Sequence, residues 1–198
     1  MKQKIDKARL LFSSESYIMD LVFEELEPYD LETDNFGNPD FLETINDLLY
    51  AIYALGEKQL CLEFYEYFEN VIPIEDKRIW TWKESSLLLF AVLFDEIGDK
   101  GTAQKCLYPV KEAFNLGNDL VVTVNENARK RKMNGDLLPY SSIKQSIEDE
   151  EKEDELTYRL ILLKGLIYIK ALGFSDSMLS ERVNKEINEN IEALKKLL

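Results

Sequence analysis

The sequence predicts an all-α protein: an irregular stack of antiparallel helical hairpins, with seven to eight helices in one domain that spans residues 1–198. Three observations lead to this prediction. Apolar residues recur every three to four positions over most of the chain, which is helical spacing. Only 8 Gly and 5 Pro occur among 198 residues, and an all-β domain of this length needs more turn residues. Apolar residues make up 45 % of the chain, enough for a sizeable core.

The N-terminal segment is expected to be helical until Pro28 ends the pattern. Apolar residues at helical spacing run from Ile5 to Leu26. A serine at position 13 or 14 is a suitable N-cap for a second helix, so residues 3–27 form either one helix or two. Residues 29–39 are rich in Asn, Asp, Gly and Pro and are expected to form a loop.

The next segment is predicted to be a helical hairpin. Asn38 is a typical N-cap and is followed by a proline, which suits the first position of a helix over residues 39–55. Gly56 ends this helix, as a residue in the left-handed conformation commonly does. A turn of three residues then leads into a helix over 58–72. A turn this short favours antiparallel packing of the two helices.

A second hairpin is predicted over residues 77–97 and 102–116, around a turn that contains Gly98. Eight consecutive apolar residues begin at Leu87. A helix that is apolar on all sides is typically buried on all sides, so this helix is expected at the centre of the fold. Pro109 lies inside the second helix and is expected to kink or split it.

The C-terminal third is predicted to contain a helix over 118–133, an irregular segment over 136–147 and a long helix over 149–172. Gly173 ends that helix, and a last helix follows from about residue 177. Two charge runs lie in this third. The basic run at 129–132 and the acidic run at 148–155 are interpreted as solvated ends of helices.

Residue usage excludes several classes of enzyme. The chain contains no histidine, which removes Ser-His-Asp and Cys-His nucleophile systems, histidine zinc sites and the usual general base near neutral pH. Cys61 and Cys106 are 45 positions apart and lie in apolar stripes, so they are interpreted as buried hydrophobes. No enzyme activity, cofactor or metal is expected. The loop that starts at Asp30 has Asn35 and Phe41 where a calcium loop needs Gly and Glu.

Location and partners are constrained by hydropathy and charge. The longest apolar run has eight residues, whereas a membrane span needs about 20, and no apolar segment follows the charged N-terminus. A cytoplasmic protein without membrane contact is therefore expected. The net charge of −14 disfavours binding to nucleic acid, because phosphate affinity needs the opposite sign. The sequence does not indicate an oligomeric state.

Most of the negative charge is concentrated in one quarter of the chain. Between Leu10 and Glu57 there are twelve acidic residues and no Lys or Arg. Such self-repulsion does not help the fold, so the segment is either a solubility device or a surface that steers a basic partner. The residues expected to form that surface are Asp30, Glu32, Asp34, Asp40, Glu43, Asp47 and Tyr67, a tyrosine whose helix neighbours are acidic or polar.

The function favoured by this pattern is a protein–protein interaction module with an acidic face for a basic partner. An immunity protein that neutralises a toxin is one concrete version, because toxins that act on nucleic acid are commonly basic. The alternative is a helical regulator that binds a small molecule, or an unusual carboxylate-based enzyme. Convergence of polar groups in a concave pocket would favour the alternative.

Overall fold

The computed structural model describes residues 1–12, 17–32, 35, 37–71, 77–115, 155–172 and 177–198. The regular secondary structure among these residues consists of helices joined by turns and loops, so the predicted all-α fold is confirmed. The predicted helix over 118–133, the irregular segment over 136–147, both C-terminal charge runs (apart from residue 155) and Gly173 lie outside the described residues. The helices are α1 (Lys2–Arg9), α2 (Tyr17–Leu26), α3 (Pro39–Ala54), α4 (Lys58–Glu63), α5 (Tyr65–Asn70), α6 (Lys77–Glu96), α7 (Lys100–Asn115), α10 (Glu155–Leu172) and α11 (Ser177–Leu194).

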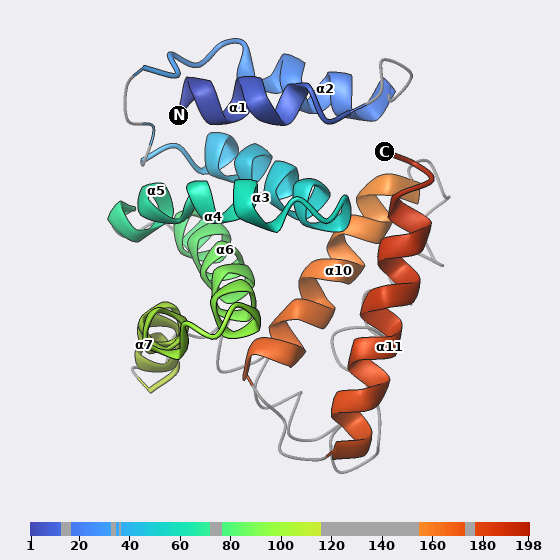
Figure 1. Ribbon diagram of the computed structural model, residues 1–198. Coiled ribbons are helices and arrows are strands. Elements are labelled where there is room, and N and C mark those ends of the chain that lie inside the picture. Colours follow the sequence, from blue (N-terminus) through green and yellow to red (C-terminus); the bar gives the residue numbers. More distant parts are fainter. Residues whose placement is uncertain (13–16, 33–34, 36, 72–76, 116–154, 173–176) are drawn as a thin grey trace.

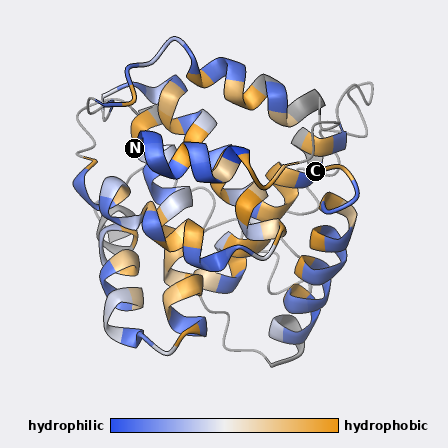
Figure 2. Ribbon diagram, turned by 45° about the horizontal axis from the view of Figure 1, so that its top comes forward, coloured by the Kyte–Doolittle hydropathy of each residue, from blue (hydrophilic) through white to orange (hydrophobic). Residues whose placement is uncertain are grey.

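The helices are arranged around α3. In Figure 1, α1 and α2 lie over one side of α3, and α6 and α10 lie on its other side. Helix α11 lies beside α10, and α7 packs against α6. Figure 2 shows hydrophobic residues mainly on the inward sides of the helices and hydrophilic residues on their outer sides. One hydrophobic core contains side chains from each of these helices.

Helix α3 begins and ends at the residues that the sequence predicts. The side-chain oxygen Oδ1 of Asn38 accepts hydrogen bonds from the backbone N–H groups of Asp40 (3.0 Å) and Phe41 (3.2 Å). These bonds satisfy two donors that the helix itself cannot. At the other end Gly56 has a φ of 89°, a conformation that suits a residue without Cβ.

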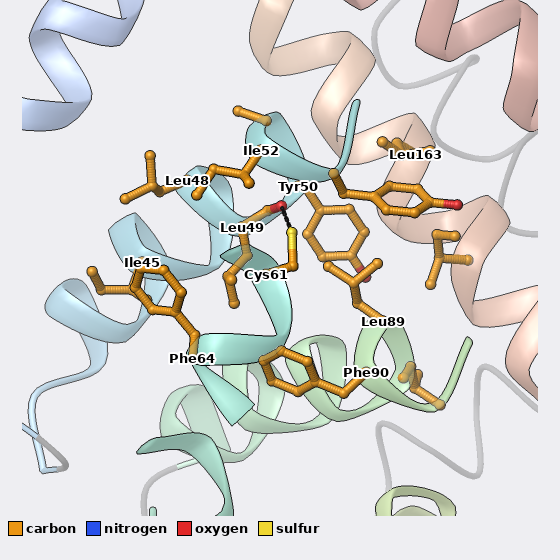
Figure 3. Close-up of a cluster of buried hydrophobic side chains, with 14 of the residues drawn as sticks. Ile45, Leu48, Leu49, Tyr50, Ile52, Cys61, Phe64, Leu89, Phe90 and Leu163 are labelled. Atoms are coloured by element: carbon orange, nitrogen blue, oxygen red, sulfur yellow. Dashed lines mark hydrogen bonds between the residues drawn. The ribbon is translucent and has the colours of Figure 1, made fainter. Parts of the chain in front are cut away.

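The centre of the core lies where α3, α4, α6 and α10 meet (Figure 3). Leu49 and Tyr50 of α3 face Leu89 of α6 there, and all three side chains are fully buried. The Cys61 thiol is also buried and lies 3.4 Å from the backbone oxygen of Leu49. The predicted burial of both cysteines is confirmed. Seven of the eight residues in the apolar run that begins at Leu87 are buried, and the last, Phe94, is partly buried against the core.

Polar side chains also join α3 to α6. The Asn46 amide donates a hydrogen bond of 2.8 Å to Ser86 Oγ, and both side chains are buried. The Tyr50 hydroxyl donates to the backbone oxygen of Ser85 at 3.1 Å. Buried polar groups need such partners, so these bonds restrict how the two helices can align.

The structure decides one open question about the helix boundaries and corrects two expectations. Residues 3–27 contain two helices, α1 and α2, which settles the alternative left open. The helix expected over 58–72 is divided at Phe64 into α4 and α5, because the N–H groups of Phe64 and Tyr67 bond to oxygens only three residues earlier. Pro109 does not split α7, which continues through it to Asn115. None of the described helices is both long and apolar enough to span a membrane.

Candidate functional site

Four carboxylates line a pocket between α2 and α3. It is lined by Glu25 of α2, by Tyr29, which follows α2, and by Asp40, Glu43, Thr44 and Asp47 of α3, and its volume is about 330 Å³. These six residues are called the acidic pocket below. The volume is at the lower end of the range of small-ligand sites, but the lining is more polar than is usual for them.

The spacing along α3 places three of the carboxylates on one face. Asp40, Glu43 and Asp47 are three and four positions apart, which is one side of an α-helix. The opposite side, which includes Phe41 and Ile45, is fully buried. Burial of the apolar stripe therefore fixes the direction in which the carboxylates point.

Helix α2 contributes the fourth carboxylate through a contact with α3. The Thr44 hydroxyl lies 3.1 Å from Glu25 Oε2 and 3.1 Å from the backbone oxygen of Asp40, both of which are acceptors. Thr44 is itself buried, so this contact holds Glu25 against the α3 face. Tyr29 forms an aromatic wall, because its ring packs edge-on against Phe41 with 4.9 Å between the centroids.

The pocket carries an excess of negative charge. The pKa of Glu43 is raised by partial burial and by the neighbouring carboxylates of Asp47, Asp40 and Glu25, while Lys164 opposes the shift. Among the described residues, no Lys or Arg forms an ion pair with Glu25 or Glu43. Asp47 differs, because the ammonium of Lys164 in α10 forms an ion pair with it. A cation that enters the pocket would relieve this repulsion.

The structure separates the predicted acidic surface into two parts. Asp40, Glu43 and Asp47 line the pocket. Asp30 and Glu32 are exposed in the loop between α2 and α3 and do not line it. Within the loop, Asp30 Oδ1 accepts a hydrogen bond of 3.0 Å from the Glu32 N–H. Glu32 also lies 3.8 Å from the Lys2 ammonium in an exposed pair. Asp34 is outside the described residues.

The predicted exposure of Tyr67 is wrong. Its side chain is only 8 % exposed, and its ring packs edge-on against Phe41 at 6.2 Å between centroids. The prediction considered only the acidic and polar neighbours Glu63, Glu66 and Asn70. Phe64 and Val71, three positions before and four after Tyr67, are both buried, and helical spacing places Tyr67 on their side.

Three pocket residues, Glu25, Tyr29 and Thr44, are not among those predicted from the sequence, and Glu25 is the carboxylate of the three. It lies beside Glu24 and Glu27 in a run of acids, and nothing in the periodicity of α2 distinguishes it from them. Only the packing of α2 on α3 brings it to Thr44. The pocket holds no nucleophilic cysteine. No cluster of three or more His, Cys, Asp or Glu side chains in the described part of the chain is arranged to hold a metal ion.

A protein-family model described as a family of unknown function, DUF6707, matches residues 24–196. The chain belongs to DUF6707. The matched region of this DUF6707 chain begins at Glu24, so it includes all six residues of the acidic pocket as well as α10 and α11. No curated protein sequence matches the DUF6707 chain, and no solved structure matches it.

Proposed function

We propose that the chain is a protein–protein interaction module and that its acidic pocket receives a basic side chain of a protein partner. The observation that carries the proposal is the convergence of Glu25, Asp40 and Glu43 from two helices with no ion-pair partner for Glu25 or Glu43 among the described residues. Like charges at this spacing reduce helix stability. A surface that only needs solubility has no need to gather them in a concave site.

The chemistry of the pocket matches an arginine or lysine side chain. Carboxylates form strong charge-assisted hydrogen bonds with guanidinium and ammonium groups. The ring of Tyr29 adds a face or edge on which the apolar part of such a side chain can pack. The surrounding charge of the N-terminal quarter would raise the association rate with a basic protein.

An immunity protein that neutralises a basic toxin is one concrete form of this proposal. The proposal includes a cytoplasmic location, since two free buried cysteines suit a reducing compartment. It excludes nucleic acid as a partner, because the pocket and the net charge repel phosphate. It also gives the carboxylates a binding role and no catalytic one.

A regulator that binds a small organic cation is a second candidate. It is favoured by the pocket volume of about 330 Å³, which is large enough for a diamine or a guanidine. A carboxylate-based enzyme is a weaker form of the same idea, and its support is the raised pKa of Glu43.

The proposal can be tested with a fluorescein-labelled octalysine peptide and the full chain. The pocket variant is Asp40→Asn/Glu43→Gln, and the control is Glu181→Gln/Glu189→Gln, which removes the same charge from the exposed face of α11. At about 50 mM salt the pocket variant should bind octalysine at least about fivefold more weakly than the control, since close charges outweigh distant ones.

Equal affinities of the two variants at low salt would contradict the proposal, because binding would then follow net charge alone. Putrescine distinguishes the second candidate. If putrescine binds the wild type more tightly than octalysine does, and the pocket variant removes that binding, the ligand is a small cation and the interaction-module proposal fails.

A further inference from the structure

A lysine of this chain already pairs with one carboxylate of the acidic pocket. Lys164 of α10 reaches α3, where its ammonium forms an ion pair with Asp47. The side chain of Lys164 is only 14 % exposed and that of Asp47 is 30 % exposed. The pair is therefore shielded more than an ordinary surface ion pair.

Two aromatic rings complete the surroundings of this ammonium. The Lys164 Nζ atom lies 4.9 Å from the ring centroid of Trp82 in α6 and 5.8 Å from that of Tyr50 in α3. A carboxylate together with aromatic faces is a favourable environment for an ammonium group. Side chains from α3, α6 and α10 thus form a cation site that Lys164 fills from within the chain.

The charge of Lys164 also acts on the rest of the pocket. Burial and the neighbouring carboxylates raise the pKa of Glu43, and the charge of Lys164 reduces that rise. Lys164 does not line the pocket itself, but Asp47 does. The lysine therefore reduces the negative potential that an entering cation meets, without blocking the pocket.

We propose that Lys164 is an intramolecular counter-ion that withholds Asp47 from a cationic partner and limits how tightly the acidic pocket binds it. This inference rests on the proposed function. It makes Lys164 a residue that sets affinity and specificity: a partner engages Glu25, Asp40 and Glu43, and gains Asp47 only if it displaces the lysine.

The test is the affinity of octalysine for the Lys164→Met variant of the full chain at low salt. The control is Lys170→Met. It removes one positive charge from the same helix, but Lys170 pairs with Glu96, which does not line the acidic pocket. Lys164→Met should bind octalysine about three- to tenfold more tightly than Lys170→Met, the effect of one unit charge close to the ligand.

A double-mutant cycle separates electrostatics from structure. Asp47→Asn should weaken binding, because it leaves the lysine charge beside Glu43 without its carboxylate. Asp47→Asn/Lys164→Met should restore an affinity close to that of the wild type, because it removes both charges of the pair. If Lys164→Met does not fold, Lys164→Gln removes the charge and keeps a hydrogen-bond donor for Asp47.

The outcomes distinguish the two claims. If Asp40→Asn/Glu43→Gln binds octalysine more weakly than its charge-matched control, but Lys164→Met binds no more tightly than Lys170→Met, the proposed function stands and the role of Lys164 is wrong. If neither comparison shows a difference, both are wrong. A Lys164→Met gain that is as large in the Asp47→Asn background as in the wild type would also overturn the inference, because the lysine would then not act through Asp47.

Discussion

Glu84 of α6 is a carboxyl group in the interior of the protein. Its side chain is 5 % exposed, and its Oε1 atom has no hydrogen-bond partner in the described part of the chain. Burial raises the pKa of Glu84 to about 8. Burial also raises the pKa of Tyr168 in α10, and the charge of Glu84 adds to this rise. Glu84 is therefore mainly neutral in the folded protein at neutral pH.

This pKa predicts how stability depends on pH. Between the ordinary value of 4.5 and about 8, the unfolded chain has released the Glu84 proton and the folded chain still holds it. The free energy of unfolding should therefore fall with rising pH across this interval, by roughly 1.4 kcal/mol per pH unit at most. Glu84→Gln stays neutral and should be more stable than the wild type at pH 7.5, with a difference that shrinks towards pH 5.

Urea unfolding at several pH values measures this difference. Glu189→Gln is the control, because Glu189 is exposed and its replacement should give a difference that does not change with pH. A Glu84→Gln effect that is constant between pH 5 and 8 would mean that the carboxyl group is ionised in the folded state.

At the scale of the helices, the burial of α6 predicts how much single substitutions in and just beyond it reduce stability. Leu89 is fully buried at the centre of the core, whereas Ile97, just beyond the end of α6, is 59 % exposed. Leu89→Ala should lower the free energy of unfolding by about 2–5 kcal/mol, the range for a large buried aliphatic side chain. Ile97→Ala should change it by less than about 0.5 kcal/mol. Chemical denaturation of both variants checks this, and equal effects would mean that α6 is not central to the core.

An ion-pair cluster connects the end of α6 to two other helices. Glu96 lies 2.7 Å from the Lys58 ammonium of α4 and 2.8 Å from that of Lys170 in α10. Burial alone would raise the pKa of Glu96, but the two lysines outweigh this effect and hold the pKa below its ordinary value. The stabilisation is thus present above pH 4.5 and is lost as pH falls through the lowered pKa.

Replacing Glu96 should therefore cost stability in a pH-dependent way. At pH 7, Glu96→Gln should lower the free energy of unfolding by about 1 kcal/mol, the usual order for partly exposed ion pairs. The difference should shrink as the pH is lowered from 7 to about 3, since the protonated carboxyl group no longer pairs with the lysines. A thermal melt of variant and wild type at both pH values measures it, and an unchanged difference at low pH would show that the loss is not electrostatic.

The sequence predicts long, regular helices well and predicts their mutual packing poorly. Asn38 and Gly56 specify both ends of α3 by local chemistry alone, so its bounds are predictable. The break at Phe64 has no proline or glycine to indicate it, so the division into α4 and α5 is not predictable from local chemistry. Asp40, Glu43 and Asp47 share a face by periodicity. Glu25 and Lys164 join them only through contacts between helices far apart in sequence, which periodicity cannot supply.

At the scale of the whole molecule, the fold concentrates part of the unevenly distributed negative charge in one place. The acids of the N-terminal quarter are not spread evenly over the surface, since four of them meet in one pocket. Glu32 and Asp47 each pair with a lysine, Lys2 and Lys164 respectively. The result is a concentration of negative charge in one pocket, which under the proposed function receives a cationic side chain. Such an arrangement favours fast and salt-sensitive association.

The most direct test of the acidic pocket as a partner site is the association rate of a natural partner. The partner is first captured from native cell extract with the wild-type chain. Its association with the wild type, with Asp40→Asn/Glu43→Gln and with the Glu181→Gln/Glu189→Gln control is then measured at about 50 and 300 mM salt. We expect the partner to be basic. At low salt it should associate several-fold more slowly with the pocket variant than with the control, and at high salt this difference should be smaller. A partner that associates equally fast with both variants at low salt would contradict this expectation.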